Sequence, residues 1–242
     1  MNTNPSVVLV HGAWGDGSCW GKVITILKEA GYRVSATQQH LNSLEEDAEI
    51  TRRVVEMQEG PVILVGHSYG GAVITEAAGK TGNVAGLVYI AAFAPDEGES
   101  LGELSKQFGA PQGNSAIRPD KYGSLWLDKE MFAAAFCQDA DKSESDIMAA
   151  VQKPIAVKCF TDKVSRPAWK YIPTWYQVSE NDQMIAPALE KFMAERMEPK
   201  DIIYLPSGHA SMVAYPKEIA RLIMDACKYV DDHQKTETGK QA

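Results

Sequence analysis

Apolar runs alternate along the chain with segments in which apolar residues recur at helical spacing. Continuous apolar runs predict strands that are buried on both faces of a parallel sheet. The predicted strands are residues 6–10, 32–37, 61–65, 84–90, 174–178 and 201–205. Helical patterns fill the intervals, which makes the first half of the chain a strict strand–helix alternation. We therefore expect an α/β protein with a mostly parallel six-stranded sheet and helices on both faces.

The alternation stops after the fourth predicted strand and resumes near residue 171. Residues 96–170 contain Gly/Pro loops, many aromatic residues and two short helical patterns, at residues 128–137 and 143–151. We interpret this segment as a helical lid inserted over an active site, and residues 1–95 and 171–242 as the core domain. The alternative is a second small domain, which about 75 residues of short helices disfavour.

The third predicted strand runs directly into Gly66-His67-Ser68-Tyr69-Gly70, and a pattern of small residues at helical spacing follows. A strand, a G-x-S-x-G sequence and a helix in this order are typical of a nucleophile elbow. Gly66 and Gly70 lack Cβ atoms, so the strand and the helix can approach closely around Ser68. Ser68 is thus predicted to be a catalytic nucleophile; the alternative is an ordinary glycine-rich turn with an incidental serine.

A serine nucleophile needs a histidine base and a carboxylate that orients the histidine. His209 follows the last predicted strand, where elbow hydrolases place the base, after the acid in chain order. The acid should follow the preceding strand, where Glu180 and Asp182 both qualify. We favour Asp182, because Glu180 abuts the strand end whereas Asp182 lies further into the turn. Asp96 is a weaker candidate, since its loop leads into the insertion.

An oxyanion needs two backbone N–H donors, one from the residue after the nucleophile and one from the loop after the first strand. Tyr69 and Ala13 are the predicted donors, and Trp14 is placed at the pocket wall. Aromatic residues of the insertion are further candidates for contacting substrate, although they could instead form the interior of the lid. They are Trp126, Phe132 and Phe136.

With these motifs in place, the sequence resembles the α/β-hydrolases of the branch that contains plant methylesterases, hydroxynitrile lyases and small bacterial esterases. The resemblance extends over residues 7–230 and is carried by four segments: residues 9–14 with Trp20, 66–71, 179–185 and 208–209. It implies the α/β-hydrolase fold without the two leading strands of larger hydrolases, and it places the acid at Asp182. The expected activity is hydrolysis of small, mostly apolar carboxylic esters through an acyl-enzyme.

Other activities on the same scaffold are cofactor-free perhydrolase or haloperoxidase chemistry, cyanohydrin cleavage, and ligand binding without catalysis. The resemblance implies that cyanohydrin cleavage needs a lysine after the histidine and a hydroxyl in the first loop. Here Ala210 and Gly12 stand in those positions. A nucleotide-binding loop at residues 12–17 is disfavoured, because no acid follows the second strand for a ribose hydroxyl.

A net charge of −8 argues against nucleic acid or an anionic membrane as a partner. No apolar stretch approaches the roughly 20 residues of a membrane span. The four cysteines have no metal-ligand or disulfide spacing, which favours a reducing compartment such as the cytoplasm. We expect a small-molecule ester as partner, neither a metal nor a cofactor, and a chain compatible with a homodimer.

Overall fold

Six parallel strands form the central sheet of the computed structural model, which describes residues 4–238. Their spatial order is β2-β1-β3-β4-β8-β9, and every neighbouring pair is parallel. The strands are β1 (Ser6–Val10), β2 (Val34–Ala36), β3 (Val62–His67), β4 (Val84–Ile90), β8 (Thr174–Ser179) and β9 (Asp201–Leu205). Each predicted apolar run overlaps one of them, so the predicted sheet is confirmed.

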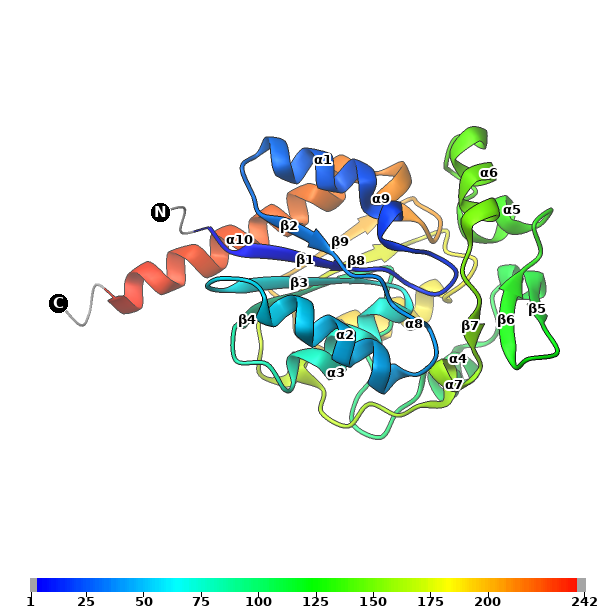
Figure 1. The fold of residues 1–242 in the computed structure, drawn as a ribbon, viewed down its shortest axis with the longest axis horizontal. Helices are drawn as coiled ribbons and strands as arrows, with labels where there is room; N and C mark the ends of the chain where they lie inside the picture. Colours follow the sequence, from blue (N-terminus) through cyan, green and yellow to red (C-terminus); the bar gives the residue numbers. More distant parts are fainter. Residues whose placement is uncertain (1–3, 239–242) are drawn as a thin grey trace.

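Helices cover both faces of this sheet (Figure 1). On one face α1 (Gly21–Glu29) packs against α10 (Pro216–Thr238); on the other, α2 (Leu44–Glu56) packs against α3 (Tyr69–Ala78). The remaining core helices are η1 (Gly17–Trp20), α8 (Pro187–Arg196), which packs against β8, and α9 (Ser211–Ala214). All residues of β1, β3 and α3 are buried, so the core lies at the centre of the sheet. No helix within residues 4–238 is both long and apolar enough to cross a bilayer.

Most of the segment between β4 and β8 lies at one end of the sheet, to the right in Figure 1, and its last part runs past α3. Its elements are α4 (Leu101–Phe108), η2 (Gln112–Ala116), β5 (Ile117–Pro119), β6 (Ser124–Leu127), α5 (Phe132–Phe136), α6 (Lys142–Val151), β7 (Ile155–Ala156), α7 (Lys158–Thr161) and η3 (Ala168–Lys170). The insertion contains helices, as expected, and in addition β5, β6 and β7 form a small antiparallel sheet that was not predicted. These strands have two to four residues, too few to show a period of two in the sequence.

Buried apolar side chains of the insertion belong to the same continuous hydrophobic core as the sheet; Leu101, Phe132 and Phe136 are examples. This continuity favours an insertion that packs onto the core over a second domain with a core of its own.

Candidate active site

Ser68 occupies the junction between β3 and α3, with φ 54° and ψ −123°. Positive φ is uncommon for a residue with a Cβ atom, so this backbone is strained. The close approach around it requires glycine: a Cβ on Gly66 would lie 2.5 Å from the carbonyl oxygen of Gly70, and one on Gly70 would lie 2.6 Å from that of Val10. The G-x-S-x-G sequence therefore forms the sharp strand-to-helix turn that its spacing predicts.

His209 and Asp182 form a fully buried pair at the ends of β9 and β8. The Nδ1 atom of His209 lies 2.6 Å from Oδ2 of Asp182, and neither side chain is exposed. Oδ1 of Asp182 accepts hydrogen bonds from the backbone N–H groups of Met184 (2.6 Å) and Ile185 (2.9 Å). Because Asp182 accepts at Nδ1, this nitrogen of His209 carries the proton. Nε2 of His209 is buried and has no hydrogen-bond partner among the described residues.

The two alternative acids lie elsewhere. The side chain of Glu180 is exposed to solvent. Its backbone N–H donates a hydrogen bond to the carbonyl of Leu205. Asp96 pairs with Lys170 in the insertion. Of the three carboxylates that the sequence offered, the fold brings only Asp182 to His209.

A second buried histidine supports the loop of His209. Nε2 of His67 donates a hydrogen bond to the backbone carbonyl of His209 (2.9 Å), and the two rings lie 4.7 Å apart. Burial lowers the pKa of His67 to about 3, so its ring stays neutral at physiological pH. A neutral His67 can hold the loop without placing a positive charge beside His209.

The loop after β1 lies directly against the nucleophile. A Cβ on Gly12 would be 2.7 Å from the Cβ of Ser68, so no side chain fits there without movement. His11 fixes this loop, because its Nδ1 donates to the carbonyl of Gly12 and its Nε2 accepts from the N–H of Gln39 (both 2.9 Å). Burial lowers the pKa of His11 to about 4 and keeps the ring neutral. Ala13, the next residue, faces the same cavity as Ser68.

Tyr69 places its side chain away from the nucleophile. Its hydroxyl donates to Oδ2 of Asp47 on α2 (2.8 Å), and the whole residue is buried. Because Tyr69 is the first residue of α3, its backbone N–H belongs to the helix end that lacks an intrahelical acceptor. This N–H is therefore free to bind an anionic oxygen.

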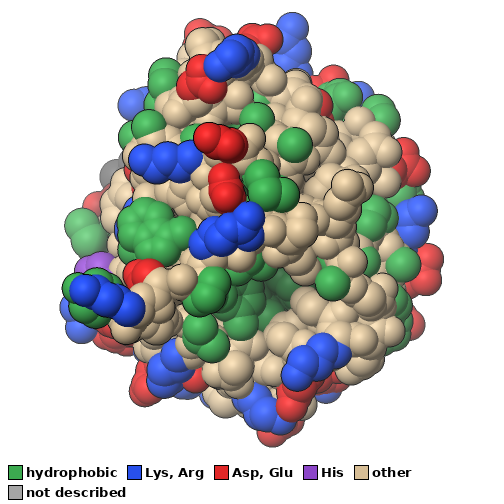
Figure 2. Space-filling model, turned by 90° about the vertical axis from the view of Figure 1, so that its right-hand side faces the viewer, with side chains coloured by type: hydrophobic (Ala, Val, Ile, Leu, Met, Phe, Trp, Pro, Cys, Tyr) green, Lys and Arg blue, Asp and Glu red, His purple; other side chains and the backbone are tan. Residues whose placement is uncertain are grey.

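A cavity of about 200 Å³ opens above Ser68 between the core and the insertion. Most of its lining is apolar, and it includes Trp14, Phe93, Leu125, Phe160, Met184 and Ile185. The face of the molecule that carries the insertion shows a hollow with hydrophobic side chains at its floor (Figure 2). Such a pocket suits an uncharged ligand with little polar surface.

Among the aromatic residues predicted to contact substrate, only Trp14 lines this cavity. Trp126 instead donates its indole N–H to Asp120 (3.0 Å). Phe132 is fully buried against Phe136, and Phe136 packs edge-on against the ring of His209. Leu125 was not predicted to line the cavity; it neighbours Trp126 on β6 and therefore points to the opposite face of the strand.

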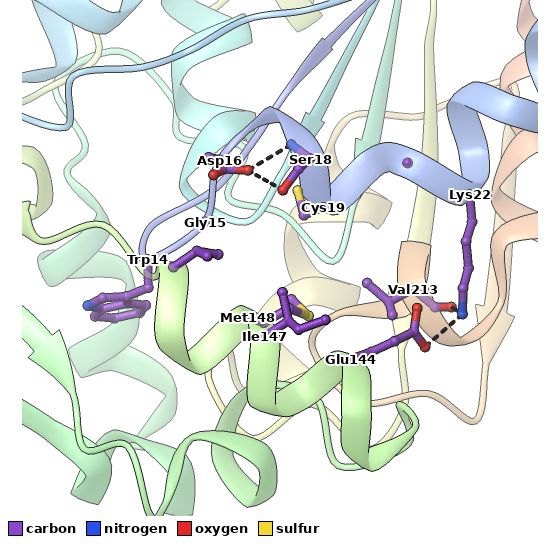
Figure 3. Close-up of a pocket in the computed structure, with 12 residues that line it drawn as sticks. Trp14, Gly15, Asp16, Ser18, Cys19, Lys22, Glu144, Ile147, Met148 and Val213 are labelled. Atoms are coloured by element: carbon purple, nitrogen blue, oxygen red, sulfur yellow. Dashed lines mark hydrogen bonds and ion pairs between the residues drawn. The ribbon is translucent and has the colours of Figure 1, made fainter.

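A larger cavity, of about 350 Å³, lies on the other side of Trp14 (Figure 3). It lies between the start of α1 and helix α6 of the insertion, and Met148 and Val213 contribute apolar surface. At one end Lys22 pairs with Glu144 (2.8 Å). Ser68 does not line this cavity, so Trp14 stands as a wall between the two spaces.

Among the residues that the structure describes, no group of three or more His, Cys, Asp and Glu side chains is arranged to hold a metal ion.

Comparison with known proteins gives relatives of similar length. The chain is 29% identical to a carbendazim hydrolyzing esterase of Nocardioides sp. (strain SG-4G), covering 88% of this chain and 96% of that protein. It is 26% identical to a pyrethroid hydrolase of Sphingobium wenxiniae, covering 98% and 92%. Methylesterase 2 of Arabidopsis thaliana is 23% identical, with 87% and 91% covered.

Solved structures share the fold. A crystal structure of a pyrethroid hydrolase from Sphingobium faniae JZ-2 superposes with a TM-score of 0.81 at 24% identity, covering 93% of this chain and 97% of that one. Polyneuridine aldehyde esterase gives a TM-score of 0.78 at 18% identity, covering 92% and 98%. The model of the alpha/beta hydrolase family matches residues 7–222. The chain therefore belongs to the alpha/beta hydrolase family.

Proposed function

We propose that this protein is a serine hydrolase that cleaves small, mostly apolar carboxylic esters. The observation that carries the proposal is the buried pair of His209 and Asp182. Nε2 of His209 has no hydrogen-bond partner among the described residues. A histidine held in this tautomer can accept a proton at Nε2. Ser68, strained at the elbow and open to an apolar cavity, is the nucleophile that such a base would activate, although its hydroxyl makes no hydrogen bond to Nε2 in this conformation.

The reaction would proceed in two halves. In the first, Oγ of Ser68 attacks the ester carbonyl while Nε2 of His209 takes the hydroxyl proton, and Asp182 stabilises the resulting imidazolium. The oxyanion is bound by the backbone N–H groups of Ala13 and Tyr69. Collapse of this intermediate breaks the bond to the alcohol, which leaves with the proton from His209. In the second half, water attacks the acyl-Ser68 ester by the same steps and releases the acid.

The substrate class follows from the cavity above Ser68. A volume of about 200 Å³ is below the range of roughly 300–1,000 Å³ that is usual for drug-sized ligands. Its mainly apolar lining and the net charge of −8 both disfavour anionic substrates. The relatives described above are named as esterases and hydrolases, which supports the reaction type.

The insertion of residues 96–170 would act as a lid over this pocket. Its attachment to the core is direct, because the indole N–H of Trp14 donates to the carbonyl of Leu125 on β6 (3.0 Å). The cysteines in the described part of the chain are free, and three of them are buried. Free buried thiols are consistent with a reducing compartment, and we place the protein in the cytoplasm, acting on small molecules rather than nucleic acid.

A panel of chromogenic esters that vary in acyl and alcohol size tests the proposal. We expect turnover of short, uncharged esters and a loss of about 10⁴- to 10⁶-fold in Ser68→Ala and His209→Ala. A fluorophosphonate probe should label wild-type protein and not Ser68→Ala. Wild-type protein that neither reacts with the probe nor hydrolyses any ester of the panel would refute the proposal.

A further inference from the structure

Glu190 is a fully buried carboxyl group in the first turns of α8. Its Oε2 accepts a hydrogen bond from the backbone N–H of Ser179 at the end of β8 (2.9 Å). Its other oxygen, Oε1, is buried and finds no hydrogen-bond donor among the described residues. A buried carboxylate with one donor for two oxygens is poorly compensated, so this group calls for another explanation.

The neighbour of Glu190 is the acid of the proposed triad. Both acids are held against Ser179: Glu190 accepts from the backbone N–H of Ser179 (2.9 Å), and Asp182 donates its own backbone N–H to the carbonyl of Ser179 (3.3 Å). The two buried carboxyl groups interact directly through their charges. Two carboxylates so close in a buried site cannot both be ionised. Asp182 receives three donors, from His209, Met184 and Ile185, whereas Glu190 receives one. The single proton of the pair therefore belongs on Glu190.

The electrostatics of the two groups agree with this assignment. Burial, followed by the charge of Asp182, raises the pKa of Glu190 well above its usual range. Burial alone would also raise the pKa of Asp182. The charge and hydrogen bond of His209, together with hydrogen bonds from Glu190 and the backbone of Ile185, outweigh burial and lower this pKa. The two pKa values are thus moved in opposite directions by their surroundings.

We propose that Glu190 is a positioning residue that remains protonated and donates its O–H to the carboxylate of Asp182. This inference rests on the proposed triad. The bond would give Asp182 a fourth donor and fix the carboxylate that orients His209. The other oxygen of Glu190 continues to accept from the N–H of Ser179, which ties the acid loop to α8 and to the end of β8. Every polar atom of the carboxylic acid then has a partner.

This arrangement makes the site sensitive to alkaline pH. The titratable groups that face Glu190 are Asp182, Tyr176 from β8 and Lys191 on α8, with His209 beyond Asp182. When Glu190 loses its proton to solvent, the O–H donor disappears and two adjacent anions repel each other. We expect Asp182 to move or to lose its hold on His209, and turnover to fall.

Infrared spectroscopy tests the protonation state without any need for catalysis. Wild-type protein at neutral pH should show a carboxylic-acid carbonyl band that is missing in Glu190→Gln. Glu195→Gln is the matched control, because Glu195 lies on the same helix but is exposed. The band should persist in this control. A wild-type spectrum without the band, or a Glu190→Gln spectrum that is unchanged from wild type, would overturn the proposal.

The pH dependence of kcat then tests the positioning role. Glutamine can donate to Asp182 and accept from Ser179, so Glu190→Gln should exceed Glu190→Leu by about tenfold or more at neutral pH. The alkaline decline of wild type and of Glu195→Gln should be weaker in Glu190→Gln, which cannot ionise. Equal turnover of the Gln and Leu variants, or an identical alkaline decline in Gln and wild type, would refute it. Should no variant hydrolyse any ester, the proposed function fails while the infrared result still decides the state of Glu190.

Discussion

Replacement of Asp182 by asparagine is the sharpest test of the proposed triad, because the structure fixes which way the amide must point. Oδ1 of Asp182 faces two backbone N–H donors, those of Met184 and Ile185. The amide oxygen of asparagine must take this position, since an NH₂ group there would oppose two donors. The NH₂ group is thereby turned towards Nδ1 of His209. In the wild-type protein this position holds Oδ2 of Asp182, which accepts the hydrogen bond from Nδ1.

A donor in that position forces His209 into its other tautomer. Nδ1 must present a lone pair, so the proton moves to Nε2, and Nε2 can no longer accept the proton of Ser68. We expect kcat to fall by about 10⁴-fold, which corresponds to about 5.5 kcal/mol of lost transition-state stabilisation. Both backbone hydrogen bonds are kept, so any loss of folding stability should be small and confined to the contact with Glu190.

The assay is the steady-state hydrolysis of the best chromogenic ester of the panel, with thermal unfolding measured in parallel. Glu180→Gln is the matched control: it removes a carboxylate from the same loop, and its side chain is exposed. We expect this control to match wild type in both measurements. Turnover of Asp182→Asn within tenfold of wild type, or a collapse in Glu180→Gln alone, would show that the acid has been assigned to the wrong residue.

Three further predictions follow from the same geometry. Phe160→Ala enlarges the cavity above Ser68 and should raise the relative rate on bulkier esters. Trp126→Ala should lower Tm and leave the ester preference unchanged. The reverse pattern would contradict the assignment of the cavity. Neither mandelonitrile nor acetone cyanohydrin should release cyanide, because Gly12 has no room for a hydroxyl-bearing side chain and Ala210 supplies no charge; Ser68-dependent cyanide release would refute this. Finally, because the pKa of Glu190 is raised in the folded state, the folded protein binds the proton of Glu190 more tightly than the unfolded chain does. The contribution of Glu190 to the free energy of unfolding should therefore decline as pH rises above about 4.3. Urea unfolding across pH should show a shallower decline in Glu190→Gln, and parallel curves would count against a raised pKa.

The central sheet and the elbow could be predicted because their signals are local. Each core strand is a run of apolar residues long enough to be recognised, and the turn at Ser68 needs glycine at two fixed positions for steric reasons. The choice between Glu180 and Asp182 was harder, because both follow β8 and differ by two residues. The fold exposes one side chain and buries the other against His209.

The insertion was predicted less well, for a physical reason. Strands of two to four residues are formed by pairing between segments that lie apart in sequence, as when β6 pairs with both β5 and β7. Without the strand, the sequence could not show that Leu125 and Trp126 face opposite ways. Trp126 was therefore expected in the pocket, and the structure places Leu125 there instead.

The sequence by itself thus determined the α/β architecture, the strained serine and the loops from which its partners come, since each depends on a few neighbouring residues. Tertiary structure alone decided what surrounds those residues: the cavity walls, the separation of two cavities by Trp14, and the burial of Glu190 beside Asp182. In the sequence Glu190 is one more acid near a helix N-terminus, where a charged carboxylate is ordinarily favourable. Burial away from water and the approach of a second carboxylate make the protonated form of Glu190 more stable than the ionised form. Both effects arise from segments that meet only when the chain folds.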